Sequence, residues 1–175
     1  PAILKDMKRP ASDLDIVQLV QRLRERVPGI ALRTTVIVGY PGERATAHQH
    51  MLDGIQQVQF DWLGAFQYSA EEGTAAATAP RQVGKATMEK RWHAVMQAQA
   101  EITQHINQAR VGAQTRVLIE DYDHQSNQWL GRSPKEAPEV DGCVYVRSTT
   151  PLTMGQFVDV EITQSLGYDL VAQAL

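Results

Sequence analysis

The chain contains almost no cysteine and no long hydrophobic run, and both absences exclude classes of protein. Cys143 is the only cysteine, so the chain can form neither an internal disulfide nor a cysteine-ligated metal cluster by itself. No apolar stretch approaches the roughly 18 residues of a transmembrane helix, and no secretory signal opens the sequence. We therefore expect a cytoplasmic protein without a membrane partner. Because the first residue is Pro1, we also expect a piece of a longer chain.

The common signatures of catalytic and metal sites are absent as well. There is no Gly-x-Ser-x-Gly, no Walker loop and no Gly-x-Gly-x-x-Gly in the sequence. The five histidines, at positions 48, 50, 93, 105 and 124, have no partner at metal-ligand spacing. Cys143 lies between apolar residues of an expected strand, where it is interpreted as a small buried hydrophobe. We expect neither a catalytic residue nor a metal ligand in this chain.

The first part of the chain alternates between helix and strand patterns. Ser12, followed by Asp13 and Asp15, is typical of a helix N-cap. The order of patterns that follows is a helix to residue 27, a strand at 32–38, a helix at 45–59, a strand at 60–69, a loop at 70–84 and a long helix at 87–110. Such an alternation predicts βα units with parallel strands. Two strands cannot close a sheet, so residues 1–110 are interpreted as part of an α/β domain.

Beyond the long helix the chain changes to short β-rich runs. They lie at residues 115–123, 128–133, 142–148 and 156–165, separated by Asn, Gly, Pro and Ser. This spacing predicts a small antiparallel β-barrel over residues 111–175, with the domain boundary at 110–113. The predicted fold class is therefore α/β followed by all-β.

The turn after the first strand carries the most specific local signal. Val36 to Val38 has no polar face, which indicates a strand covered on both sides, as in a parallel sheet. Gly39 would allow close approach of a ligand and Gly42 a positive φ, while Glu43 would complement a helix dipole. Backbone groups at this strand end could hydrogen-bond a flat heterocycle, although an ordinary strand-to-helix turn explains the pattern equally well.

Several motifs along nearly the whole chain resemble one known family. They are, in order, ILKDMKRPAS, LRTTVIVGYPGE, GAFQYSAEEGT, RQVG, EKRW and GRSPKEAPEVDG followed by VYV. Together they resemble the radical S-adenosylmethionine methylthiotransferases. The GRSPKEAPEVDG stretch at 131–142 and the Gly167-Tyr168-Asp169-Leu170 ending are similar to the branch that modifies ribosomal protein S-12 rather than tRNA.

This resemblance implies a fold and an activity for the longer protein. The fold would be the C-terminal half of a six-stranded partial (β/α) radical barrel, followed by a TRAM domain, which is a small OB-like β-barrel. The whole enzyme would use S-adenosylmethionine and two 4Fe–4S clusters to methylthiolate the β-carbon of an aspartate in S-12. The cluster ligands would lie upstream of Pro1, so this fragment alone should be inactive.

The resemblance also places site residues on both domains. For the cofactor it implies Val38, Gly39 and Gly42 at the adenine end, Tyr68 at the barrel mouth, and Arg33, or alternatively Arg9, at the carboxylate. For the substrate it implies Trp129, Arg132, Glu139 and Asp141. An exposed arginine at a strand start and a core tryptophan remain the plain alternatives for Arg33 and Trp129.

Charge separates the two parts of the chain and bears on the partner. Residues 1–110 carry 13 Lys and Arg against 11 Asp and Glu, whereas residues 111–175 carry 4 against 9. An acidic barrel argues against RNA binding and favours a basic ribosomal protein, although mild acidity also serves solubility. Two alternatives stay open: a tRNA-modifying methylthiotransferase, and a non-catalytic interaction module.

Overall fold

The structure is a computed structural model that describes residues 2–9 and 16–175. The helix cap expected at Ser12, Asp13 and Asp15 lies outside the described residues. The chain separates into two compact units, Pro1–Gln99 and Ala100–Leu175. The long helix α4, Lys85–Ala109, contributes residues to both units, and each unit is described by itself. No helix among the described residues is both long and apolar enough to cross a membrane.

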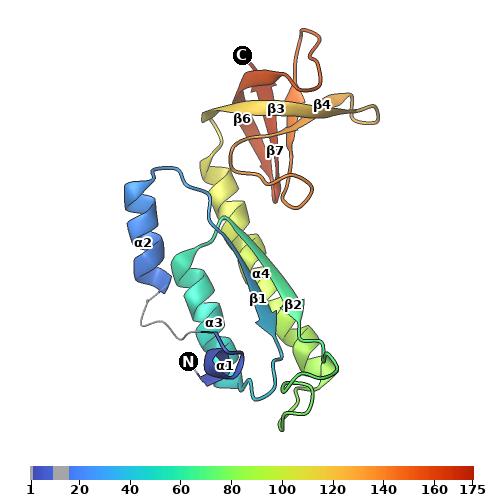
Figure 1. Ribbon diagram of the computed structural model, residues 1–175. Helices are drawn as coiled ribbons and strands as arrows, with labels where there is room; N and C mark the ends of the chain where they lie inside the picture. The colour runs from blue at the N-terminus through green and yellow to red at the C-terminus, as the bar shows by residue number, and fades with distance from the viewer. Residues whose placement is uncertain (1, 10–15) are drawn as a thin grey trace. The chain divides into compact units, whose positions relative to one another are not determined.

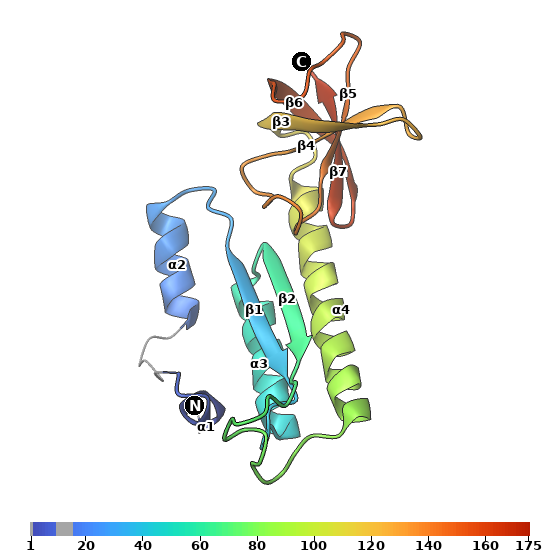
Figure 2. The ribbon, with the colours of Figure 1, turned by 45° about the vertical axis from the view of Figure 1, so that its right-hand side comes forward.

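The first unit contains a two-stranded parallel sheet with helices packed beside it (Figures 1 and 2). Its elements are α1 (Ala2–Asp6), α2 (Ile16–Arg26), β1 (Arg33–Val38), α3 (Ala45–Val58), β2 (Trp62–Gln67) and the first part of α4. The strands pair in parallel from Arg33 opposite Trp62 to Val38 opposite Gln67. This order and direction confirm the predicted βα alternation. Helix α1 was not predicted.

One face of this sheet is covered and the other is open in the described residues. Val38 of β1, Ile55 and Val58 of α3 and Val95 of α4 are buried. On the strands, Ile37 is 42% exposed and Phe66 is 63% exposed. The prediction that β1 is covered on both faces is therefore wrong for this chain, because its helices supply a cover for a single face.

The second unit is a closed five-stranded barrel that follows the end of α4 (Figure 1). Its strands are β3 (Gln114–Asp123), β4 (Gln128–Arg132), β5 (Val144–Arg147), β6 (Phe157–Leu166) and β7 (Asp169–Ala174). Their order around the barrel is β3-β4-β5-β7-β6. The interior is filled by alternate residues of the strands, among them Val117 and Ile119 of β3 and Val158, Val160 and Ile162 of β6. This confirms a small β-barrel after a partial α/β unit.

The barrel differs from the prediction in one strand and one direction. Strand β7 was not predicted as a strand, and it pairs in parallel with β5, from Val144 opposite Leu170 to Arg147 opposite Gln173. The other four pairings are antiparallel. Because β7 turns back from β6 and then lies beside β5, it closes the barrel, and a wholly antiparallel barrel is therefore a wrong description.

Candidate functional site

Four of the expected cofactor residues meet at the carboxyl end of the two parallel strands. Val38 ends β1 and is fully buried, and Gly39 and Gly42 lie in the turn that follows it. Tyr68 follows β2, and its N–H donates to the Val38 carbonyl at 2.9 Å. Ligands of open α/β sheets bind at this end of the strands. The structure therefore brings these four residues together at the carboxyl end of the sheet.

The buried Glu43 side chain fixes the turn that follows β1. Its Oε2 accepts the Gly39 N–H at 2.8 Å, and its Oε1 accepts a hydrogen bond from Arg91 at 2.8 Å. The Glu43 and Arg91 side chains are only 5% and 12% exposed, so this is a nearly buried ion pair. Glu43 thus binds the turn and α4. It does not serve the helix dipole as expected, because α3 begins at Ala45 after an N-cap at Arg44.

The two glycines of the turn have different neighbours. Both have a positive φ, 80° at Gly39 and 83° at Gly42. A Cβ on Gly39 would lie 2.2 Å from the Met88 Cγ of α4, whereas a Cβ on Gly42 would meet no atom of the described residues within 4 Å. The close approach at Gly39 is therefore made by Met88 of the protein itself. Gly42 is the glycine with open space beside it.

Two aromatic rings and one unpaired hydroxyl complete this end of the sheet. The Tyr40 and Tyr68 rings meet edge to face with centroids 5.4 Å apart. The Tyr68 hydroxyl is buried and has no hydrogen-bond partner among residues 2–9 and 16–175. His48 lies near Glu43, with Nδ1 4.0 Å from Oε1, and burial lowers the pKa of His48 below its ordinary value. An unpaired buried hydroxyl is costly, and a bound polar ligand could satisfy it.

Arg33, expected at the cofactor's carboxylate, does not join this group. Arg33 begins β1 and is five positions before Val38, about 16 Å along an extended strand. Arg33 is exposed at the amino end of the strand. Arg9 is exposed after α1. The structure thus leaves Arg33 outside the cluster formed by Val38, Gly42 and Tyr68.

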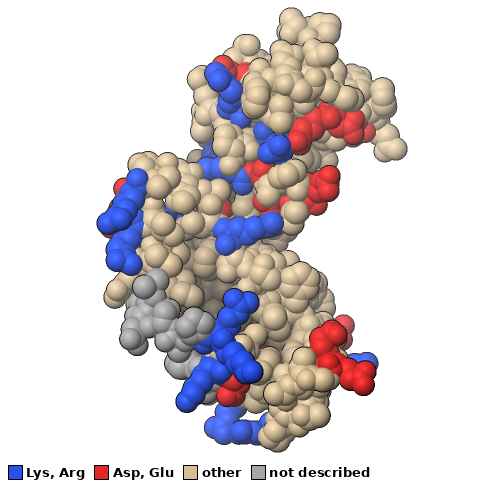
Figure 3. Space-filling view, in the orientation of Figure 1, with Lys and Arg blue, Asp and Glu red and all other residues tan. Residues whose placement is uncertain are grey.

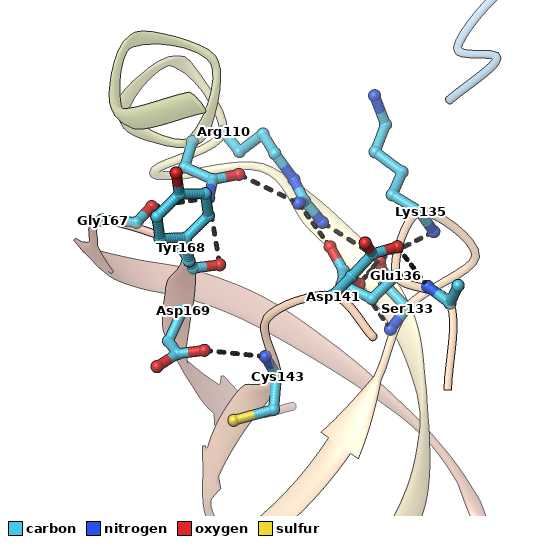
Figure 4. A network of polar contacts seen from close by, with 11 residues as sticks. Arg110, Ser133, Lys135, Glu136, Asp141, Cys143, Gly167, Tyr168 and Asp169 are labelled. Atoms are coloured by element: carbon cyan, nitrogen blue, oxygen red, sulfur yellow. Dashed lines mark hydrogen bonds and ion pairs between the residues drawn. The ribbon is translucent and has the colours of Figure 1, made fainter. Parts of the chain in front are cut away.

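In the second unit, the 131–142 stretch folds into a loop held by a buried ion pair (Figure 4). Glu136 is 4% exposed, and its Oε1 accepts a hydrogen bond from Arg110 at 2.7 Å. Its Oε2 accepts the Ser133 N–H at 2.8 Å and the Ser133 hydroxyl at 2.5 Å. Arg110 also donates to the Ser133 Oγ at 3.0 Å. Glu136 and Arg110 therefore fix the start of the loop.

The end of the same loop is fixed by a second set of contacts. The Asp141 carboxylate accepts the Ala137 N–H at 2.8 Å, so Asp141 stabilises the loop. A Cβ on Gly142 would lie 2.0 Å from the Tyr168 carbonyl oxygen. The next N–H, of Cys143, donates to the Asp169 carboxylate at 2.9 Å (Figure 4). Glu139, in contrast, is exposed and has a φ of 63°, so it is a loop residue open to a partner.

Cys143 itself is a poor nucleophile. Burial raises the pKa of its thiol to about 11, and the nearby Asp169 carboxylate adds to this rise. Little thiolate is present at neutral pH under these conditions. The interpretation of Cys143 as a packing residue agrees with its half-buried position.

The remaining expected substrate residues lie on the β3–β4 ribbon. Trp129 is partly buried against the barrel core and stacks edge to face with Tyr122 at 4.8 Å between centroids. Arg132 Nε donates to Glu120 Oε1 at 2.6 Å, and their side chains are 32% and 40% exposed. Trp129 is thus mainly a packing residue, whereas Arg132 is accessible but ion-paired.

Sequence reasoning missed the two buried ion pairs. Ser133 and Glu136 have the S-x-x-E spacing of a capping box, and that pattern could have identified Glu136 as a partner of the Ser133 N–H. Nothing in the sequence pairs Arg91 with Glu43, 48 positions away. Across residues 2–9 and 16–175, no group of three or more His, Cys, Asp or Glu is placed to hold a metal ion.

Known proteins match this chain along nearly its whole length. Residues 111–175 match the TRAM domain family. The chain is 42% identical over 172 residues to the ribosomal protein uS12 methylthiotransferase RimO of Desulforamulus reducens, covering 98% of this chain and 39% of that protein. It is 44% identical over 175 residues to the protein of the same name from Synechococcus sp. strain JA-3-3Ab, covering 100% and 38%. The chain thus spans about two fifths of the length of the curated relatives it matches.

Proposed function

We propose that this chain, which is related over its whole length to the C-terminal part of the ribosomal protein uS12 methylthiotransferases, serves that activity in a longer enzyme. The observation that carries the proposal is the 42–44% identity across both units, including the TRAM barrel. The reaction would place a methylthio group on the β-carbon of an aspartate in uS12. We place this enzyme in the cytoplasm with its ribosomal substrate.

S-adenosylmethionine is the cofactor that the family implies, and part of the first unit fits it. The unpaired Tyr68 hydroxyl and the open space beside Gly42 lie at the carboxyl end of the strands. When bound next to a 4Fe–4S cluster, this cofactor supplies a radical able to remove hydrogen from an unactivated carbon. Its clusters need ligands from outside this chain, because one cysteine cannot hold a 4Fe–4S cluster.

The residues of this chain would bind and orient the cofactor. Tyr68 would donate a hydrogen bond from its hydroxyl, and the edge of Tyr40 would border the same position. Glu43 and Arg91 would keep the turn rigid, because the Gly39 N–H and the α4 guanidinium meet on one carboxylate. Gly42 would let the backbone approach the ligand. Arg33 is left out of this proposal because it lies at the other end of β1.

The TRAM barrel would receive the basic substrate. Glu139 is exposed on the 131–142 loop, which Glu136 and Arg110 hold from inside. Asp121 and Glu120 add negative charge on β3 (Figure 3 shows acidic side chains over the β3–β4 ribbon). Such a field raises the rate at which a Lys- and Arg-rich protein is captured. We therefore propose uS12, and not tRNA, as the partner of this barrel.

The proposal is tested by expressing the complete reading frame that contains this chain in a bacterium lacking its own uS12 methylthiotransferase. Mass spectrometry of uS12 should then show the methylthio group on an aspartate, and tRNA should stay unmodified. A modified tRNA with unmodified uS12 would assign the chain to the tRNA-modifying enzymes instead. In parallel, the purified chain should bind uS12 more tightly than tRNA at physiological salt.

A further inference from the structure

The exposed arginines of the barrel surface at β3 and β4 are both occupied by carboxylates. Arg116 Nε donates to Asp159 Oδ1 at 2.9 Å, and its second guanidinium contact with Asp159 Oδ2 is 3.4 Å. Arg132 donates to Glu120 at 2.6 Å. The hydrogen bond from Arg116 lowers the pKa of Asp159, so this carboxylate stays ionised over a wide pH range. A phosphate approaching either arginine therefore meets a guanidinium whose positive charge a carboxylate already balances.

An exposed aromatic side chain lies on the same surface. Phe157 of β6 is 65% exposed and stands opposite Leu118 of β3, and Leu118 stands opposite Arg132 of β4. Arg116 is two residues before Leu118 and stands opposite Asp159. Residues directly opposite one another share a face of the sheet. We call this surface the β3–β4–β6 face; its residues are Arg116, Leu118, Glu120, Arg132, Phe157 and Asp159.

Without its carboxylates, this face would have the chemistry of a single-strand binding surface. An exposed aromatic ring stacks on bases, and nearby arginines bind the phosphates between them. The two carboxylates, Glu120 and Asp159, remove the interaction between the arginines and the phosphates. In Figure 3, Lys and Arg side chains of the barrel lie next to Asp and Glu side chains. The face therefore keeps an apolar contact area and loses its attraction for a phosphate backbone.

We propose that Glu120 and Asp159 determine specificity by occupying Arg132 and Arg116, which keeps single-stranded RNA off the β3–β4–β6 face and leaves it to a polypeptide. The proposal rests on the protein-substrate part of the proposed function. It assigns Glu120 and Asp159 a role in specificity that the net charge of the barrel alone does not predict. Removing them frees the guanidinium groups of Arg116 and Arg132 on the face that carries Phe157, whereas removing Asp121 or Glu161 frees neither of these two arginines.

The test compares two double variants of the chain with equal charge changes. Glu120→Gln with Asp159→Asn frees both arginines. Asp121→Asn with Glu161→Gln removes the same charge and frees neither, because in the described part of the chain the arginines at 116 and 132 pair with Asp159 and Glu120. Exposed ion pairs contribute little to stability, so both variants should fold, as circular dichroism would check.

RNA affinity is measured by fluorescence anisotropy with a labelled oligouridylate of about 16 nucleotides, the upper site size of an OB fold. Two freed phosphate contacts should make the plot of log affinity against log salt steeper by about 1.4, since each contact on a single strand contributes about 0.7. We expect about a tenfold gain in affinity at 50 mM salt for the first variant over its control. Phe157→Ala in the same background should remove part of that gain.

Each outcome decides the proposal. A steeper salt dependence confined to the Glu120 and Asp159 variant supports it. Equal gains in both variants would show that net charge alone excludes RNA, and no gain in either would show that the arginines are not available to phosphate; either result overturns it. If the unaltered chain binds uS12 while the variant gains no RNA affinity, the role of the two carboxylates fails and the proposed function stands.

Discussion

Replacing Gly39 by alanine tests how the turn after β1 is built. Gly39 has a φ of 80°, and a Cβ there would lie 2.2 Å from Met88 Cγ and 2.5 Å from Met88 Sδ. The left-handed conformation costs a non-glycine residue about 1–2 kcal/mol. Forcing a methyl group into the packed contact with Met88 costs a further ~1–3 kcal/mol. We expect Gly39→Ala to lower the free energy of unfolding of the first unit by about 2–5 kcal/mol.

Gly42→Ala is the matched control. Its φ of 83° is nearly the same, but in the part of the chain that the structure describes no atom lies within 4 Å of the new Cβ, so only the conformational cost of about 1–2 kcal/mol remains. Urea unfolding is followed by tryptophan fluorescence in a Trp129→Phe background, in which Trp62 and Trp92 report on the first unit. With a slope of about 2 kcal/mol per molar urea, the midpoint should fall by about 1–2.5 M for Gly39→Ala and about 0.5–1 M for the control.

A third variant separates packing from backbone strain. Combining Gly39→Ala with Met88→Ala removes the side chain that the new methyl group meets, so the double variant should lose less stability than the sum of the two single changes. If Gly39→Ala costs no more than Gly42→Ala, or if the two changes are simply additive, the contact with Met88 does not explain the glycine. The close approach would then have to be attributed to a bound ligand.

Two further predictions concern the barrel. Glu136→Ala should lower the free energy of unfolding of the second unit by about 3–5 kcal/mol, because it leaves Arg110 buried without its partner; thermal unfolding followed by circular dichroism measures this, and a loss under 1 kcal/mol contradicts it. Cys143 should react slowly with iodoacetamide at pH 8 and faster as the pH approaches 11, because burial raises its pKa from 9.0 to about 11. The raised pKa also means that the barrel loses stability as the pH rises above 9, since the unfolded chain ionises first.

The order of helices and strands was predictable from the sequence, whereas the burial of each element was less predictable. Apolar spacing on α3 placed it within one or two residues of its observed bounds, Ala45–Val58. The same reasoning made β1 a doubly covered strand, yet Ile37 is 42% exposed. Periodicity reports which side chains are apolar, but the number of covering layers depends on elements that a local pattern does not contain. Strand β7 was missed although it forms a hairpin with β6. Its second partner, β5, ends at Arg147, more than twenty residues earlier, so that pairing leaves no local signal.

The candidate site was predictable in its position and not in its internal contacts. Glycines and a proline after β1 indicated a special turn, and the structure places Tyr68 beside it. That Gly39 is packed against Met88, and Glu43 against Arg91, depends on α4, which returns to the turn about 45 residues later. Pairs this distant in sequence leave no mark in spacing or composition. In the barrel, the S-x-x-E spacing could have predicted the contact between Ser133 and Glu136, because both residues lie in one loop.

The parallel pairing of β5 with β7 sets the order of events during synthesis on the ribosome. Three antiparallel pairings, β3–β4, β3–β6 and β4–β5, involve no residue of β7, but the sheet cannot close until β7 has emerged to residue 174. Until then β5 presents an open strand edge, which can pair with another nascent chain. The Leu175 N–H also bonds to the Asp159 carbonyl at 2.9 Å. Any affinity tag attached after this residue needs a flexible spacer, because the last strand is the closing element of the barrel.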